Sequence, residues 1–271
     1  MRTFNVTGLP MQVNASSNGD QRKWHIKTDK EDIYVKEQLF LKVRWKDNLV
    51  EKIASAICRQ LDIDWLRYSE YELCEIVDDS EVTQGCYSYS FLKESEELVT
   101  LYNMMLTTNT TLLSSDDIPK IYLKLLNTFT DFGIEKATDY LSVLFLVDYL
   151  LCNTDRHLSN ITAIRYEHGY KSAPMFDFGQ GLFQGSFSHA IMPVQEMMHM
   201  LSYKPYMRSF EDVMKFYWSQ GTIRSYIPKE LDVTGLQFPD FNSAIVLGLQ
   251  CKSLNIKLKG VERQDVSNKF G

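Results

Sequence analysis

The chain has 271 residues, of which 44% are hydrophobic and 24% are charged, as is usual for a soluble globular protein. This length is sufficient for one large domain or for two modest lobes around a cleft. The formal net charge of -6 argues against non-specific binding to nucleic acid, because such binding needs a basic surface that displaces the counterions of the phosphates.

The sequence gives no sign of export or membrane insertion. Residues 1–20 contain no apolar run of signal-peptide length, and the most apolar stretch, Leu141 to Leu151, holds Asp148 and is too short to span a bilayer. We therefore expect a cytoplasmic protein. Its five cysteines form no Cys-x-x-Cys pair, which predicts scattered buried thiols in place of disulfides or a zinc site: Cys58, Cys74, Cys86, Cys152 and Cys251.

The first third of the chain has the pattern of β-strands. Residues 24–28 and 32–36 alternate apolar and polar side chains on either side of a polar turn, and residues 39–43 could continue the pattern. Further strand-like segments are residues 71–77 and 86–92. Between these groups a helix is predicted, with Asp47 and Asn48 as its cap and an apolar stripe of Ile53, Ala54, Ile57 and Leu61.

The remainder is predicted to be mainly helical. Residues 94–105 form one candidate helix, and residues 118–129 form another that is capped by Ser115, Asp116 and Asp117. Gly133 ends that helix, a longer apolar helix covers residues 134–151, and residues 210–218 form a further helix. The fold class is therefore α+β, with a small β-rich N-lobe (residues 1–93) and a larger, mainly helical C-lobe (residues 94–271).

One constellation in the C-lobe points to phosphoryl transfer. The pattern Asp155-x-His157-x-x-Asn160 is followed by Asp177-Phe178-Gly179. In this order, the first Asp orients the acceptor hydroxyl and takes its proton, while the Asn and the second Asp bind Mg²⁺ on the nucleotide phosphates. Any one of these residues could merely cap a helix, but all of them at this spacing favour a catalytic site.

Several residues near this pattern carry further expectations. His157 is expected to point at the transferred phosphoryl group, and Arg156 either pairs with a carboxylate or lies in solvent. Residues 160–164 and 174–176 are expected to pair as strands and so bring Asn160 and Asp177 together. A second Asp-Phe-Gly, at residues 131–133, precedes the catalytic turn and is interpreted as a helix end, where Gly133 accepts a left-handed conformation.

The nucleotide side of the site has a weaker signal. A small polar loop could hold phosphate through its N–H groups and hydroxyls, and it contains Ser16, Ser17, Asn18 and Gly19. A phosphate-binding lysine and a helix glutamate follow in the required order as Lys36 and Glu51. Lys42 competes with Lys36, since it also lies in an apolar strand, and the loop lacks a G-x-G-x-x-G pattern.

With Asn153 before Asp155 and Ala173-Pro174-Met175-Phe176 before Asp177, the chain resembles the HipA-like kinases. It also resembles phosphatidylinositol 3- and 4-kinases, which share an Asp-Arg-His-x-x-Asn turn followed by Asp-Phe-Gly, and it looks close to the cell-translocating kinase A type. The resemblance implies an ATP- and Mg²⁺-dependent kinase that acts on Ser/Thr of proteins, autophosphorylates and, in some members, is delivered outside the producing cell. Asp155 would be the base, Asn160 and Asp177 the metal ligands, and Lys36 the phosphate-binding lysine.

The composition around Asp177 bears on the acceptor. Residues 172–203 contain no Lys or Arg, whereas a phosphoinositide headgroup needs basic partners. The segment is apolar, with Met192, Met197, Met198 and Met200, and favours a protein hydroxyl as acceptor. The alternatives are a phosphoinositide or small-molecule kinase, or a pseudokinase that only binds nucleotide. The sequence leaves the oligomeric state open.

Overall fold

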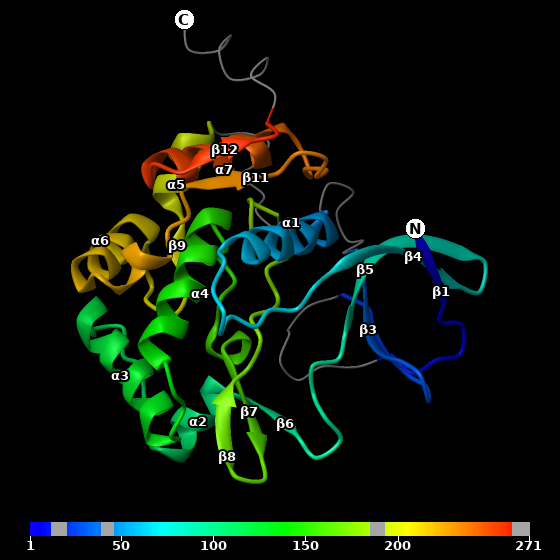
Figure 1. Ribbon diagram of the computed structural model, residues 1–271, viewed down its shortest axis with the longest axis horizontal. Coiled ribbons are helices and arrows are strands. Elements are labelled where there is room, and N and C mark those ends of the chain that lie inside the picture. The colour runs from blue at the N-terminus through cyan, green and yellow to red at the C-terminus, as the bar shows by residue number, and fades with distance from the viewer. Residues whose placement is uncertain (12–20, 39–45, 185–192, 262–271) are drawn as a thin grey trace, which may run out of the picture.

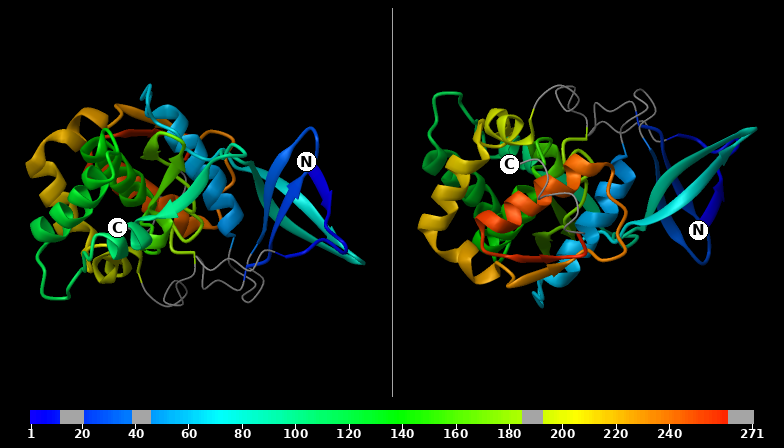
Figure 2. Two further views of the ribbon diagram at one scale, coloured as in Figure 1. Left: turned by 90° about the horizontal axis from the view of Figure 1, so that it is seen from below. Right: turned by 90° about the horizontal axis from the view of Figure 1, so that it is seen from above.

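The computed structural model describes residues 1–11, 21–38, 46–184 and 193–261. It is an α+β protein of two parts: a β-sheet formed by the N-terminal segments and a larger, mainly helical body, with helix α1 between them (Figure 1). The same arrangement is visible from the two perpendicular directions, where the sheet stands at one end of the molecule (Figure 2). The α+β, two-lobed fold predicted from the sequence is confirmed.

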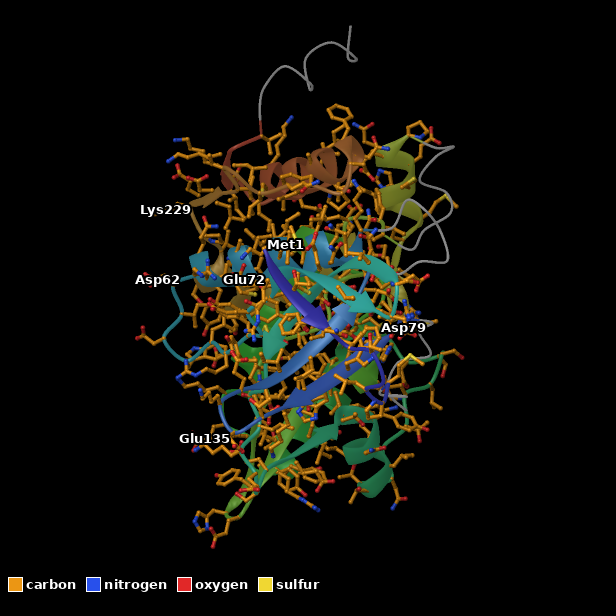
Figure 3. All side chains as sticks on the ribbon, turned by 90° about the vertical axis from the view of Figure 1, so that its right-hand side faces the viewer. Met1, Asp62, Glu72, Asp79, Glu135 and Lys229 are labelled. Carbon is orange, nitrogen blue, oxygen red and sulfur yellow. The ribbon has the colours of Figure 1, made fainter. Side chains whose placement is uncertain are left out.

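The N-terminal sheet has five strands in the order β1-β4-β5-β3-β2. Neighbouring strands are antiparallel except β1 and β4, which run parallel. Figure 3 looks onto this sheet and labels Glu72 near the start of β4 and Asp79 at the turn after it. The strands are β1 (Arg2–Asn5), β2 (Lys23–Lys27), β3 (Asp32–Glu37), β4 (Glu72–Asp78) and β5 (Glu81–Tyr89).

Alternating side chains of the sheet form a small core of their own, because successive residues of a strand point to opposite faces. Its members are buried apolar residues of β1 to β4 and the residue after β1: Phe4, Val6, Trp24, Ile33, Val35, Cys74 and Ile76. The strands predicted at residues 24–28, 32–36 and 71–77 are confirmed as β2, β3 and β4. The strand predicted at residues 86–92 is confirmed only in part, because β5 begins at Glu81 and ends at Tyr89. Strand β1 was not predicted, and residues 39–43 lie outside the described residues.

Helix α1 (Asp47–Gln60) joins the sheet to the helical body, since it contacts β4 and β5 on one side and α4 on the other. Its predicted apolar stripe is buried. The predicted cap is wrong: Lys46 occupies the N-cap without a side-chain cap bond, and Asp47 is the first helical residue. The carboxylate of Asp47 instead accepts a hydrogen bond from Gln21, and it still lies in the first turn, where a negative charge is favourable.

The helical body is centred on α4 (Ala137–Leu151), in which nearly every residue is buried. Around it lie α3 (Ile118–Asp131), α6 (Phe210–Gln220) and α7 (Phe241–Ser253), and the shorter helices α2 (Leu101–Thr107) and α5 (Val194–Met200). The smaller sheets are β6 (Glu97–Thr100), β7 (Thr162–Tyr166) and β8 (Gly169–Ser172); β9 (Ser202–Tyr203) and β10 (Arg208–Ser209); and β11 (Glu230–Asp232) and β12 (Lys257–Lys259).

The predicted ends of α3 and of the apolar helix α4 are confirmed in part. Asp117 caps α3 by accepting a hydrogen bond of 2.9 Å from the N–H of Lys120, and Gly133 follows the helix at φ 69°, as predicted. Residues 134–136 are not helical, however. Lys136 has φ 54°, so α4 begins only at Ala137.

Two other predictions about local structure are wrong. Residues 94–105 do not form one helix, because residues 97–100 pair with β7 as strand β6 and the hydroxyl of Thr100 then caps α2. Residues 174–176 do not pair with residues 160–164, because β7 pairs with β8 through a tight hairpin. Met175 forms an isolated bridge to Tyr68 instead.

Other sequence-based expectations concern the whole chain. All five cysteines are free and buried, as predicted. No helix in the described part of the chain is long and apolar enough to cross a membrane. Strand β5 ends at Tyr89 and β6 begins at Glu97 in another sheet, and the division between residues 93 and 94 remains a prediction.

Candidate active site

Three segments far apart in the sequence meet at Lys36 on β3. Its Nζ lies 2.7 Å from Oε1 of Glu51 on α1 and 2.6 Å from Oδ1 of Asp177. The other oxygen of Glu51 accepts a hydrogen bond of 3.0 Å from the N–H of Phe178. The glutamate therefore holds both the lysine and the Asp-Phe-Gly loop, and the structure brings together Lys36, Glu51 and Asp177.

Electrostatic interactions keep Lys36 and Asp177 ionised. Burial opposes the charge of Lys36, but the negative charges of Asp177 and Glu51 outweigh it and raise the pKa of Lys36 well above its ordinary value. Burial likewise opposes the charge of Asp177, but Lys36 and Lys23 lower the pKa of this carboxyl below its ordinary value. At neutral pH Lys36 is therefore a buried ammonium beside the ionised carboxylate of Asp177.

The Asp-Phe-Gly loop has a special backbone. Asp177 has φ 63°, in the left-handed region that costs free energy for a residue with a Cβ, although Asp tolerates it better than most. Gly179 packs closely against α1, and a Cβ added there would lie 3.1 Å from Cβ of Asp47. The loop is thus pressed against the helix that carries Glu51.

A buried ion pair supports the candidate catalytic turn. Arg156 is fully buried, and it donates from Nε to Oδ2 of Asp148 at 2.9 Å and from Nη2 to Oδ1 at 3.1 Å. Asn153 also donates to Oδ1 of Asp148, at 2.7 Å, and its own Oδ1 accepts from the N–H of Asp155 at 3.3 Å. Of the two alternatives for Arg156, pairing with a carboxylate is the one found.

Arg156 also joins the two candidate metal ligands. Its Nη1 donates to the backbone carbonyl of Asn160 at 3.0 Å and to that of Phe176 at 2.8 Å. Phe176 directly precedes Asp177, so one guanidinium fixes both segments. This contact replaces the strand pairing that was predicted to bring Asn160 and Asp177 together.

Asp155 lies at the surface of the turn. Its Oδ1 accepts a hydrogen bond from Lys204, and its backbone carbonyl accepts one of 3.4 Å from Nδ2 of Asn160. The Nε2 of His157 lies 4.0 Å from Oδ2 of Asp155, which is too long for a hydrogen bond. Partial burial lowers the pKa of His157 and the charge of Asp155 opposes this, so the ring is neutral at neutral pH.

A pocket of about 340 Å³ opens beside these residues. Its lining includes the apolar side chains of Phe91, Leu92 and Leu98, and Lys23, Lys36 and Asp177 supply the charges. The full lining is Lys23, Tyr34, Val35, Lys36, Ser69, Tyr71, Ser88, Tyr89, Ser90, Phe91, Leu92, Leu98, Thr100, Ser159, Phe176 and Asp177. A pocket that combines apolar side chains with two lysines suits a base and a phosphate chain.

Lys23 was missed by the sequence analysis. It is paired in register with Lys36 across β2 and β3, so both side chains are on the same face of the sheet. Burial and the charge of Lys36 lower the pKa of Lys23. Its place directly before the alternating segment at residues 24–28 was the available signal.

The candidate metal ligands are of the right chemical type. The amide oxygen of Asn160 and the carboxylate of Asp177 are hard donors, and Mg²⁺ commonly takes one or two protein ligands and completes its shell with phosphate and water. The described residues contain no cluster of three or more His, Cys, Asp or Glu that could hold a metal ion by themselves. By their chemistry, the oxygens of Asn160 and Asp177 fit a metal whose remaining ligands are phosphate and water. Lys42 and the predicted loop of Ser16, Ser17, Asn18 and Gly19 lie outside the described residues.

Comparison with known proteins identifies the type of fold. No protein-family profile and no curated protein matches the sequence. Among solved structures, the chain is similar to the proinflammatory kinase CtkA of Helicobacter pylori, with 17% identity, a TM-score of 0.57, and coverage of 93% of this chain and 94% of that one. A chain of the HipA, HipB and operator DNA complex of Shewanella oneidensis MR-1 is 10% identical, with a TM-score of 0.40 over 92% of this chain and 64% of that one. The two-lobed fold described above is thus a kinase-like fold that this chain shares with CtkA.

Proposed function

We propose that the protein transfers the γ-phosphoryl group of ATP to Ser and Thr hydroxyls of proteins, including its own. The observation that carries the proposal is the connected set of side chains at the cleft. Glu51 and Lys36 hold Asp177 on one side, and Arg156 ties the segment before Asp177 to the turn of Asp155 and Asn160 on the other. Each residue type that phosphoryl transfer needs is present in this set.

The chemistry proceeds by in-line displacement. The acceptor hydroxyl loses its proton to the Asp155 carboxylate as its oxygen bonds to the γ-phosphorus, and the bond from that phosphorus to the β,γ-bridging oxygen breaks. The bond electrons leave with ADP. Lys36 and Lys23 provide positive charge for the phosphate chain, and neutral His157 would donate from a ring nitrogen to the transferred group.

Asn160 and Asp177 would hold Mg²⁺ on the nucleotide. When bound, the metal would supply positive charge against the phosphate oxygens. The Lys36 ammonium beside Asp177 keeps that carboxylate ionised and so ready to act as a ligand.

The acceptor is proposed from charge. The absence of Lys and Arg from residues 172–203 leaves this stretch without partners for an inositol phosphate and favours a peptide. A phosphoinositide or small-molecule acceptor, and nucleotide binding without transfer, are the competing functions, and the same experiment separates them.

The test is phosphoryl transfer from radiolabelled ATP with Mg²⁺ to a generic protein, a phosphoinositide and an aminoglycoside. Asp155→Ala and Asp177→Ala should each abolish labelling of protein, because one removes the base and the other a metal ligand. Asp131→Ala is the matched control: it alters the other Asp-Phe-Gly, at the end of α3, and should label as the wild type does.

Equal labelling by the wild type and by both site variants would contradict the mechanism. Labelling of lipid or aminoglycoside alone would contradict the choice of acceptor, and nucleotide binding without transfer would indicate a pseudokinase. The lysine is tested separately by nucleotide affinity: Lys36→Ala should lose roughly 10-fold or more, as expected for a charged hydrogen bond to phosphate, whereas Lys42→Ala should not.

A further inference from the structure

A lysine outside the predicted motifs contacts the proposed base. Residues 172–203 contain no Lys or Arg, and Lys204 directly follows them. Its Nζ forms an ion pair with Oδ1 of Asp155. Both side chains are partly exposed, at 46% and 36%. An exposed ion pair on flexible side chains contributes little stability by itself, so the interest of this pair depends on how it is held.

The backbone of Lys204 is fixed by its neighbour. Tyr203 is buried, and its hydroxyl donates to Oδ2 of Asp148 at 2.7 Å. Its ring packs edge-on against Phe145 of α4, with ring centroids 5.1 Å apart, and its carbonyl accepts from the N–H of Met207 at 2.9 Å in the turn between β9 and β10. The backbone of Lys204 is therefore held in a well-packed part of the fold, although its own side chain is partly exposed.

The carboxylate of Asp148 bonds residues next to each member of the pair. Asp148 accepts a hydrogen bond from Tyr203, which precedes Lys204. It also accepts hydrogen bonds from Asn153 and Arg156, which lie on either side of Asp155. The separation between the two backbone segments is therefore set by one buried anchor. This relation distinguishes the Lys204–Asp155 pair from an ordinary surface pair, whose partners are placed independently.

The contact also gives the two oxygens of the Asp155 carboxylate different roles. Lys204 donates to Oδ1 of Asp155. In the proposed reaction this bond would restrain the carboxylate and leave Oδ2 to accept the proton of the acceptor hydroxyl. A base must lie within hydrogen-bond reach of that proton, and an error of about 1 Å in such positions can cost on the order of 100-fold in rate.

We propose that Lys204 is a positioning residue for Asp155, which holds the base in its productive orientation during phosphoryl transfer. This inference rests on the proposed function, because it assigns a part of the same site. It predicts an effect on the chemical step and none on the binding of either substrate.

The test compares Lys204→Ala, Lys204→Arg and the wild type in steady-state kinetics with ATP and a protein acceptor. Lys204→Ala should lower kcat roughly 10- to 100-fold with little change in either KM, and Lys204→Arg should restore most of the rate, since a guanidinium can also hold a carboxylate oxygen. ATP affinity, measured by calorimetry, should be unchanged in both variants. Lys171→Ala is the matched control: Lys171 has the same exposed fraction of 46% and forms a 2.6 Å ion pair with Glu96 on the β6–β8 side, and its loss should leave kcat unchanged.

The outcomes separate the two proposals. A wild type without transferase activity contradicts the proposed function and the role of Lys204 with it. An active wild type with normal kcat in Lys204→Ala overturns the inference alone. A raised KM for the acceptor with unchanged kcat also overturns it, because Lys204 would then recognise the substrate. A kcat of Lys204→Arg as low as that of Lys204→Ala would show that a positive charge at this position is not sufficient and would likewise count against it.

Discussion

The side chains of Arg156 and Asp148 form a bidentate ion pair in which both are fully buried. The pair lies under the candidate catalytic turn, and Asp148 accepts further hydrogen bonds from Asn153 and Tyr203. Burying two charges costs free energy that further hydrogen bonds must offset, and here each nitrogen of the guanidinium donates at least one. The turn that carries Asp155 therefore depends on a fully buried residue of α4.

Removing the Asp148 carboxylate should lower the stability of the protein. Asp148→Ala leaves the guanidinium of Arg156 buried without its partner, and should lower the free energy of unfolding by about 3–5 kcal/mol. Urea denaturation followed by circular dichroism measures this. The control is Glu97→Ala, which removes an exposed ion pair with Arg165 and should cost no more than about 1 kcal/mol. Equal effects of the two substitutions would contradict the role given to the buried pair.

Gly85 should tolerate no side chain. It lies on β5 opposite β3, and a Cβ added there would overlap the carbonyl oxygen of Lys36 and come within 2.6 Å of Cδ1 of Ile76. Gly85→Ala should destabilise the fold by about 1–3 kcal/mol and weaken ATP binding, because it displaces the strand that carries Lys36.

Gly248 is the contrasting position. It lies within α7 with no atom within 4 Å of an added Cβ, so Gly248→Ala should stabilise by about 0.5–1 kcal/mol and leave ATP affinity unchanged. Thermal denaturation and a nucleotide titration of both variants test the pair. A Gly85→Ala protein with wild-type stability and affinity would refute the close approach of β5 to β3.

Lys23 should support ATP binding at a cost in stability. Lys23→Met removes a charge that burial and Lys36 disfavour, so the free energy of unfolding should rise at neutral pH, while ATP affinity should fall roughly 10-fold and adenosine affinity should not change. Lys27→Met, at the exposed end of the same strand, is the control and should change neither quantity.

The pH dependence of the Lys23 effect has a definite sign. The pKa of Lys23 is lower in the folded than in the unfolded protein, so the unfolded chain binds more protons between the two values and wild-type stability rises with pH there. The advantage of Lys23→Met should therefore shrink as the pH is raised from neutral into that interval. A constant or growing advantage would be inconsistent with a lowered pKa.

His157 should titrate below the ordinary histidine value of about 6.5, because burial disfavours its charged form. NMR titration of the ring measures this pKa. The Asp155 charge raises the pKa and the Lys204 charge lowers it, so Asp155→Ala should shift the titration further down and Lys204→Ala should shift it up. Shifts in the opposite directions would contradict the placement of the ring near Asp155 and Lys204.

The elements best predicted from the sequence were those with strong local signals. The alternating strands β2 and β3, the capped helix α3 and the apolar helix α4 needed only periodicity and end signals. The prediction failed at residues 94–105, where a strand and a short helix follow each other, because pairing with β7 decides the conformation of residues 97–100. The short strand β1 was not predicted for the same reason: it pairs with β4, which is distant in the chain.

By itself the sequence determined the chemical types of the candidate site and their order along the chain, because Asp155, Asn160 and Asp177 lie in one recognisable spacing and Lys36 and Glu51 precede them in separate elements. Tertiary structure alone decided that Lys36 contacts Asp177 across the cleft, that Arg156 joins the two metal-ligand segments, and that Lys23 and Lys204 belong beside them. The reason is that these contacts depend on strand register and on a buried carboxylate, Asp148, that collects side chains from different parts of the chain. Neither leaves a local pattern in the sequence.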